Sequence, residues 1–245
     1  KRLWLFFKEM NAMKKALWKD TFREIRHSLG RFLAILFIIL IGVAFYVGIR
    51  ASGPDMLHTA STYFDNQNLM DAQVISTVGL EDEDLELINE WVDGEVQPHT
   101  TKDVVFTNDN EVVRLISLND SKNAINKYRV IEGRLPEAPN EIALDDLFWE
   151  NGIFKLNDVV KIDPEFVVNQ DAKDEDEQDI LLTQSEFKVV GFVRSPLYVE
   201  RVSRGNTSVG SGSLNAFGVV LPEAIDTYRY TDTYLTFNQT KGLTS

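Results

Sequence analysis

The amino-acid sequence predicts an α+β fold: an N-terminal amphipathic helix and one transmembrane helix, followed by a β-rich extracytoplasmic domain of two lobes. Three observations lead to this prediction. An apolar run of 18 residues, Phe32 to Ile49, contains no charged side chain. Basic residues are concentrated before this run and acidic residues after it. Beyond the run, short segments rich in β-branched residues alternate with short helical segments, which is the pattern of a mixed fold.

The first element, residues 1–31, has the pattern of a basic amphipathic helix. Its apolar residues recur mostly at spacings of three, four or seven and share one helical face: Leu3, Phe7, Met10, Leu17, Phe22, Ile25, Leu29 and Phe32. The basic side chains lie largely off this face. We expect six of them to contact lipid headgroups at the cytoplasmic surface: Lys14, Lys15, Lys19, Arg23, Arg26 and Arg31. The alternative is a cytoplasmic helix that packs on another protein.

The second element, residues 32–50, is predicted to cross a membrane, with Phe32 and Ile49 at the ends of the apolar run. A helix of 18 residues is about 27 Å long, close to the roughly 30 Å thickness of the hydrocarbon core of a bilayer. Buried core helices usually have shorter apolar runs. A signal peptide has a shorter basic region and a small-residue cleavage site, whereas Arg50 ends this run. We therefore predict an uncleaved anchor.

The charge distribution predicts the orientation of this anchor. Residues 1–50 contain ten Lys or Arg and three Asp or Glu, a net charge of +7. The remaining residues contain 15 basic and 35 acidic side chains, a net charge of −20. Because Lys and Arg are retained on the cytoplasmic side, we predict a plasma-membrane protein with its N-terminus in the cytoplasm and residues 51–245 outside. An acidic outer part also argues against nucleic acid as its partner.

The outer part begins with residues 51–66, which can continue the helix outward as a stalk with a kink or a restart at Gly53–Pro54. Residues 80–92 are predicted to form a second helix. Acidic residues occupy its N-terminus, and four apolar residues share one of its faces: Leu80, Leu87, Ile88 and Trp91. Pro222 is predicted to open a short helix. Strands are predicted at residues 72–78, 111–118, 159–162, 187–193, 217–221 and 234–237.

These elements suggest three regions outside the membrane. We expect residues 51–130 to form the stalk and a first lobe, residues 131–225 a second lobe, and residues 226–245 a strand that returns toward the membrane. Asn169–Asp179 is strongly acidic and lacks the spacing of an EF-hand, so a solvated loop is favoured over a calcium site. Ser203–Ser213, rich in Gly and Ser, is predicted to be a flexible loop.

No catalytic, cofactor-binding or metal-binding residue is predicted. The absence of Cys excludes disulfides and thiolate metal sites. His27, His58 and His99 lie far apart in sequence and do not have the spacing of zinc ligands. Asp145 and Asp146 are adjacent, so their side chains diverge, and they suit the N-terminus of a helix better than an acid–base pair.

Four stretches, taken in order, resemble the FtsX/MacB-type permeases of ABC transporters, the type VII or mechanotransmission family. The stretch ALWKDTFREIRHSLGRFLAILFIILIGVAFYVGI is similar to the amphipathic helix and first transmembrane helix of that family. YRVIEGRLPEAPNEIALDDLF, at 128–148, resembles its G-R-x-P … N-E stretch. FKLNDVVKI and FKVVGFV, at 154–162 and 187–193, resemble a strand pair in which Asn157 replaces the usual glycine. GVVLP followed by TYLTF resembles the strand that returns toward the membrane.

The resemblance implies a permease subunit with four transmembrane helices and an extracytoplasmic domain between the first two, of which this chain is the N-terminal part. It implies no enzyme activity in the chain itself, because ATP and Mg²⁺ would bind to a separate ATPase. The implied partners are an ABC ATPase dimer, a second copy of the permease or a paralogue, membrane lipid, and an extracellular protein or peptide cargo.

Two other classes of function are compatible with parts of the sequence. A single-pass, membrane-anchored binding or sensor domain explains the charge distribution and the span equally well. It does not predict the basic amphipathic helix that runs into the span. A membrane-bound hydrolase would need a nucleophile, and no G-x-S-x-G elbow singles out a serine.

Overall fold

The structure of the chain is a computed structural model, which describes residues 18–24, 26–108, 110–119, 121, 123–167, 181–201, 204–227 and 229–238. The chain forms two compact units, Lys1–Ser61 and Thr62–Ser245. The predictions made for Lys14, Lys15 and the acidic segment 169–179 lie outside the described residues.

The described residues of the first unit are mainly helical. Residues 18–24 and 26–27 are helical, and after a turn at Ser28 the long helix α2 (Leu29–Asn66) follows. The turn keeps a helical hydrogen-bonding pattern, since Ser28 N donates to Glu24 O and Phe32 N donates to Ser28 O, both at 3.0 Å. Pro54 lies inside α2, so the helix does not restart there, and the stalk predicted for residues 51–66 is helical. The last residues of α2 belong to the second unit.

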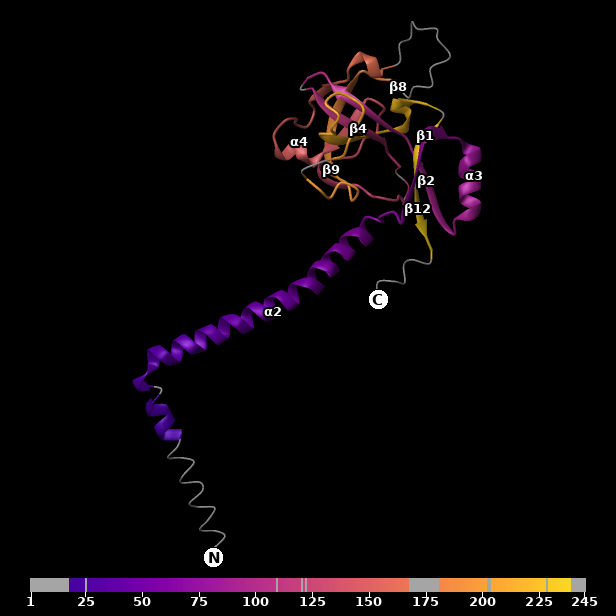
Figure 1. Ribbon diagram of the computed structural model, residues 1–245. Coiled ribbons are helices and arrows are strands. Elements are labelled where there is room, and N and C mark those ends of the chain that lie inside the picture. The colour runs from indigo at the N-terminus through magenta and orange to yellow at the C-terminus, as the bar shows by residue number, and fades with distance from the viewer. Residues whose placement is uncertain are drawn as a thin grey trace, which may run out of the picture. The chain divides into compact units, whose positions relative to one another are not determined.

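The second unit is rich in strands (Figure 1). Its described elements are, in chain order, β1 (Ala72–Leu80), α3 (Asp82–Trp91), β2 (Gly94–His99), β3 (Thr101–Phe106), β4 (Glu111–Ser117), β5 (Arg129–Gly133), β6 (Glu141–Asp145), α4 (Asp146–Glu150), β7 (Val159–Lys161), η1 (Pro164–Phe166), β8 (Leu181–Leu182), β9 (Glu186–Arg194), β10 (Ala216–Val220), η2 (Pro222–Ala224), β11 (Ile225–Asp226) and β12 (Tyr230–Phe237). Together with α2 they confirm the predicted α+β class, a long apolar helix followed by a β-rich domain.

The larger sheet has the strand order β3-β4-β10-β6-β9-β5, and β7 also pairs with β9. Its centre is β10, which runs parallel to β4 and antiparallel to β6. All five residues of β10, AFGVV, are buried because apolar side chains cover both faces of the sheet. Gly218 allows the neighbouring side chains to approach, since a Cβ there would lie 2.9 Å from Ile142 Cδ1.

Two apolar clusters cover the opposite faces of this sheet, because side chains alternate along each strand. One cluster includes Leu115, Leu144 and Phe192. The other includes Ile116, Phe217 and Val219, with Tyr128 and Tyr198 packed against it. Tyr198 stacks on Phe217 with ring centroids 4.8 Å apart.

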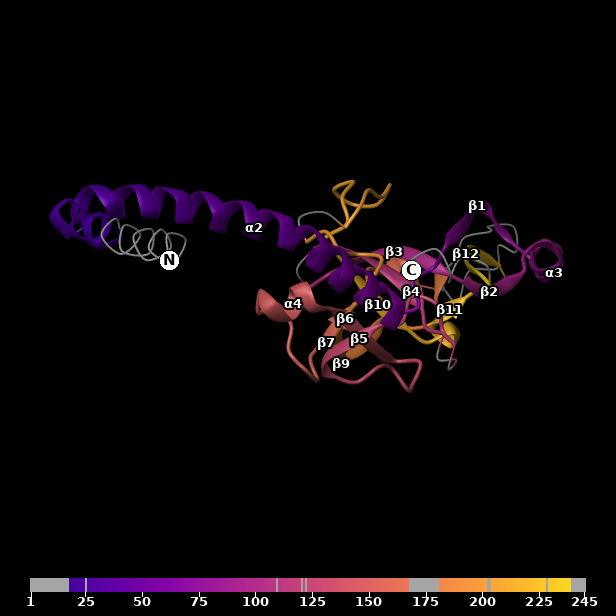
Figure 2. The same ribbon diagram turned by 90° about the horizontal axis from the view of Figure 1, so that it is seen from below.

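The smaller sheet has the order β1-β12-β2, with both pairs antiparallel. The last described strand therefore lies between the first two, which ties the C-terminal part of the unit to its beginning. Helix α3 contacts β2 and, as Figures 1 and 2 show, lies on the side of this sheet away from the larger sheet. A separate pair, β8 and β11, is also antiparallel.

The strands predicted from β-branched runs are present, within a few residues, as β1, β4, β7, β9, β10 and β12. The helix predicted at residues 80–92 is α3, and Pro222 begins η2. The predicted boundary between residues 130 and 131 stays a prediction, although hydrogen bonding crosses it: β3 and β4 belong to the same sheet as β5 and β6.

Candidate functional site

The predicted span lies inside α2, with Phe32 and Ile49 both in the helix. All side chains from Phe32 to Ile49 are exposed. Among the described residues, α2 is the helix long and apolar enough to cross a membrane. Its 38 residues correspond to about 57 Å, so roughly 25 Å of helix follows Ile49 after a bilayer has been crossed. An apolar surface of this length fits a membrane-anchored protein.

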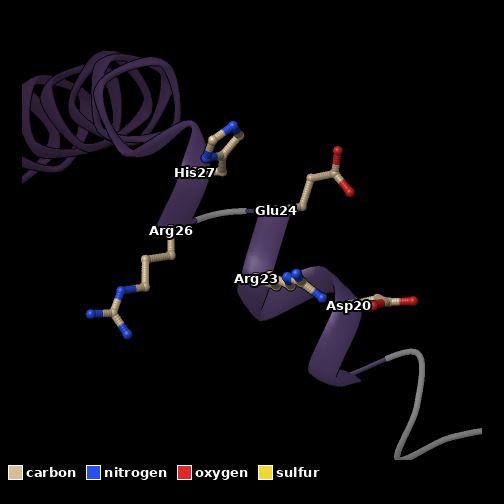
Figure 3. A pocket seen from close by; sticks show the side chains of 5 residues that line it. All are labelled: Asp20, Arg23, Glu24, Arg26 and His27. Atoms are coloured by element: carbon tan, nitrogen blue, oxygen red, sulfur yellow. The ribbon is translucent and has the colours of Figure 1, made fainter.

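The described basic residues of the head are Lys19, Arg23, Arg26 and Arg31, and all four are exposed. A wide hollow of about 780 Å³ lies in this segment, lined by Asp20, Arg23, Glu24, Arg26 and His27. Figure 3 shows these side chains pointing in different directions, with Arg26 directed away from Glu24. The described lining residues are all polar and titratable, unlike the mostly apolar lining of a small-molecule site.

The C-terminal end of α2 is closed by a Schellman motif. Asn68 adopts a φ of 49°, in the left-handed region that asparagine tolerates. Its backbone N–H donates to Asp65 O at 3.1 Å, and the N–H of Leu69 donates to Phe64 O at 3.1 Å. These two bonds satisfy carbonyl groups that a helix otherwise leaves without partners. The end of the helix is thus fixed by local chemistry.

The same end of α2 is hydrogen-bonded to a turn at residues 123–127. Asn126 N donates to Asn68 O at 2.9 Å, and Lys127 N donates to Gln67 O at 2.8 Å. The Asn68 side chain donates to Ala124 O at 3.2 Å, and Met70 N donates to Asn126 Oδ1 at 3.0 Å. We call residues 67–70 and 123–127 the joint. It connects the C-terminal end of α2 to the rest of the second unit.

The joint is also attached to β2 of the smaller sheet. The Gln97 side chain donates to Asn123 O at 3.0 Å and accepts from Ile125 N at 2.8 Å. The Asn123 side chain donates to Glu95 Oε1 at 3.1 Å. One short turn therefore forms hydrogen bonds with both the end of α2 and the smaller sheet.

A cavity of about 200 Å³ adjoins the joint, lined by residues that include His99, Asn126 and Tyr128. His99 is buried; its Nδ1 lies 3.0 Å from Ser117 O and its ring lies 4.5 Å from that of Tyr234. Burial lowers the pKa of His99, although the hydrogen bond to Ser117 and the charge of Asp232 oppose this shift. A neutral imidazole donates from Nδ1 to the carbonyl, so His99 has a structural role here, as a lone histidine usually does.

Asp145 and Asp146 both contact arginine side chains. Asp145 caps α4 by accepting from Leu147 N at 3.1 Å, as predicted for a helix N-terminus. The buried Arg204 binds both oxygens of Asp145 at 2.7 and 2.9 Å. Asp146 pairs with Arg194 and Arg201. Both carboxylates are therefore occupied by arginines.

Three further observations concern this ion-pair cluster. The segment predicted as a flexible loop at Ser203–Ser213 is anchored at its described start, because Arg204 is buried against Asp145. Burial raises the pKa of Asp145 to about 6, against the opposing effect of Arg204. The phenol of Tyr63, in the last turn of α2, lies within electrostatic reach of Arg194, whose pKa is raised mainly by its hydrogen bond to Asp146.

Sequence reasoning predicted the span and the basic head but did not predict the joint. Asn68 and Asn126 have no motif around them, and 58 residues of chain separate them, so only the fold brings them together. Comparison with known families gives one match: a family model described as the MacB-like periplasmic core domain covers residues 32–242. A search of curated proteins found no match.

Proposed function

Because the chain belongs to the family with a MacB-like periplasmic core domain, which is a permease component of ABC transporters, we propose that it couples ATP hydrolysis in a separate ATPase to motion of its outer domain. The outer domain would then drive export or extrusion, or regulate a partner outside the membrane. This chain itself would carry no catalytic residue. ATP and Mg²⁺ would bind to the ATPase dimer, and the permease would act beside a second copy or a paralogue.

The observation that carries this proposal is the connection between the span and the joint. The apolar run lies mainly in the N-terminal half of helix α2. The residues that are hydrogen-bonded to the outer domain lie directly after the C-terminal end of the same helix. A ligand shifts an equilibrium between two conformations only by its different affinity for them. ATP bound to the ATPase can therefore act outside the membrane only if contacts such as the joint link the two sides.

The basic head has a matching role in this proposal. Lys14, Lys15, Lys19, Arg23, Arg26 and Arg31 would hold the segment 1–31 at the cytoplasmic surface, in contact with lipid headgroups. The ATPase would bind on the same side of the membrane. The cargo or regulated partner, a protein or peptide, would bind outside.

The experiment uses the full-length permease co-expressed with its neighbouring ATPase. This chain contains no Cys, so Glu165→Cys, in a full-length permease and ATPase from which any other Cys has been removed, can carry a spin label on the exposed surface of the outer domain without background. We expect the two proteins to co-purify and the distance between labels on the two permease copies to change when ATP is trapped in the ATPase. The combined variant Asn68→Ala and Asn126→Ala should reduce this change.

A matched control is Asn108→Ala, which removes an exposed asparagine whose side chain donates to Val159 O, away from the joint. This control should leave the ATP-dependent distance change intact. A permease that purifies as a monomer without the ATPase, or a label distance that ATP does not alter, would contradict the proposal. Equal effects of the joint and control variants would contradict the role of the joint alone.

A further inference from the structure

Helix α3 exposes an apolar stripe that nothing in the described part of the chain covers. The helix packs on the smaller sheet through Leu85 and Ile88, which are half-buried. Trp91 is 87% exposed and Leu87 57% exposed. The sequence predicted that Leu87 and Trp91 would share an apolar face with Ile88. In the structure, Ile88 of this predicted face is half-buried, whereas Leu87 and Trp91 are exposed to solvent.

The two sides of α3 differ. A groove of about 450 Å³ between α3 and β2 is lined by Asp82, Leu85, Glu86, Asn89, Val96 and Pro98. Successive residues in a helix are about 100° apart, so Leu87 and Trp91 lie on the side of α3 opposite to that groove. Figure 2 shows α3 at the outer edge of the domain, with the smaller sheet between it and the larger one. Within the part of the chain that the structure describes, the stripe is thus an uncovered helix face.

The charge around the stripe is mainly negative. Residues 81–95, which include α3, contain eight Asp or Glu and no Lys or Arg. Glu81 pairs with Arg229. No ion pair with Glu83, Asp84, Glu86 or Glu90 occurs among the residues that the structure describes. The apolar stripe therefore lies within a strongly anionic surface.

This charge decides between possible occupants. A second copy docked through the same face would bring like charges together, because a two-fold interface pairs a patch with itself. An anionic lipid surface would be repelled for the same reason. Opposite charge speeds association and rejects wrong partners, while a central aromatic side chain supplies most of the affinity of an interface.

We propose that the exposed face of α3, centred on Leu87 and Trp91, is a docking surface for a basic polypeptide segment that carries apolar side chains. The apolar side chains of that segment bury Leu87 and Trp91, and its Lys or Arg residues pair with Glu83 and Glu90. This inference goes beyond the proposed function and does not depend on ATP-driven motion, because a membrane-anchored binding domain would use the same face.

The test uses the full-length protein in nanodiscs of zwitterionic lipid and a fluorescent helical peptide made of Lys and Leu. Matched probes replace every Lys with Glu, or every Leu with Ser, and empty nanodiscs give the background. We expect the Lys–Leu peptide alone to bind. Trp91→Ala should weaken binding about tenfold or more, as loss of an aromatic anchor does. Trp149→Ala, which alters a tryptophan 45% exposed on α4, should leave the affinity unchanged.

Charge variants separate the polar from the apolar contribution. The combined Glu83→Gln and Glu90→Gln variant should bind more weakly and lose most of the salt dependence of the affinity. The inference is overturned by equal binding of the Glu–Leu peptide, or by equal losses for Trp91→Ala and Trp149→Ala. It is also overturned by self-association that depends on Trp91 in the absence of peptide, or by Trp91-dependent binding to anionic vesicles.

Discussion

At the scale of single residues, asparagine adopts a left-handed backbone conformation that is more common for glycine. Asn68, Asn126 and Asn157 have φ angles of 49°, 55° and 72°, in the left-handed region. Asparagine enters this region at lower cost than other residues with a Cβ, because its short side chain can bond locally. Asn157 stands where the family pattern implied by the resemblance would have glycine, and its φ of 72° lies in the region that glycine favours. At the joint, asparagine adds side-chain hydrogen bonds that glycine could not make.

The stretch that resembles G-R-x-P … N-E also has a structural explanation. Gly133 has a φ of 74°, and a Cβ there would lie 2.2 Å from Val190 O. Arg134 binds both oxygens of Glu141, at 2.6 and 2.7 Å. Gly191, in the VVG stretch, approaches Arg134 so closely that a Cβ would lie 2.1 Å from its carbonyl oxygen. The two stretches are therefore packed against each other, which accounts for both glycines and for the Arg and Glu.

The ion pair between Arg134 and Glu141 leads to a prediction about the stability of the fold at acid pH. The hydrogen bond from Arg134 is the main cause that lowers the pKa of Glu141 from 4.5 to about 2. A carboxylate with a lowered pKa in the folded state stabilises the fold above its unfolded pKa, and this contribution is lost as the pH falls from about 4.5 to about 2. We expect Glu141→Gln to reduce the free energy of unfolding at neutral pH and to match the parent protein near pH 2.

Urea unfolding over a series of pH values would measure this difference. Glu132→Gln is the control, since Glu132 is exposed on β5 and no ion pair with it occurs among the described residues. The control should follow the parent protein at every pH. A Glu141→Gln variant that is equally destabilised at both ends of the pH range would show that the loss is steric rather than electrostatic.

At the scale of elements, the sequence predicts best the strands that are continuous and apolar. The run around β10 is buried on both faces, so hydrophobicity alone marks it. Strand β2 was missed because its sequence, GEVQPH, contains a proline and polar residues; it lies at an edge of the smaller sheet, where proline is tolerated. The contact between Arg204 and Asp145 spans 59 residues, and no local pattern signals it.

Two segments that the sequence marks as loops are expected to respond differently to deletion. Val167 and Leu182 form a β-bridge, so the chain on either side of Asp171–Asp179 is already held together. Deleting these nine residues should change the free energy of unfolding by less than about 1 kcal/mol, because loop length has only a weak logarithmic effect. Thermal and urea unfolding would measure the change.

The matched control removes Gly205–Ser213, also nine residues. Val209 packs on the core of the larger sheet, and Asn206 bridges to Ser213. We expect this deletion to cost about 2 kcal/mol or more, because it removes buried contacts as well as chain length. Similar stability of the two deletion variants would mean that the Gly- and Ser-rich segment contributes no packing. A large loss on deleting Asp171–Asp179 would reveal an ordered role for that segment.

At the scale of the whole molecule, charge and hydropathy predict the arrangement across the membrane before any fold is known. A net charge of +7 lies in residues 1–50, and −20 in the remainder. Net charge and hydropathy are sums over the sequence, so they can be calculated without knowing which residues are in contact in the fold. The joint and the pairing of β12 between β1 and β2 depend instead on residues far apart in sequence, and only the folded chain reveals them.

The predicted orientation can be tested with single cysteines, because the chain has no Cys of its own. Ser28→Cys and Ser211→Cys each replace an exposed serine, one before the span and one in the outer domain. Lys and Arg on the head favour the cytoplasmic side, so a membrane-impermeant maleimide should label Ser211→Cys in intact cells. It should label Ser28→Cys only after the membrane is opened, and the parent chain in neither case. Labelling of both variants in intact cells would mean that α2 does not separate two compartments, and the outward position of the α3 docking surface would fail with it.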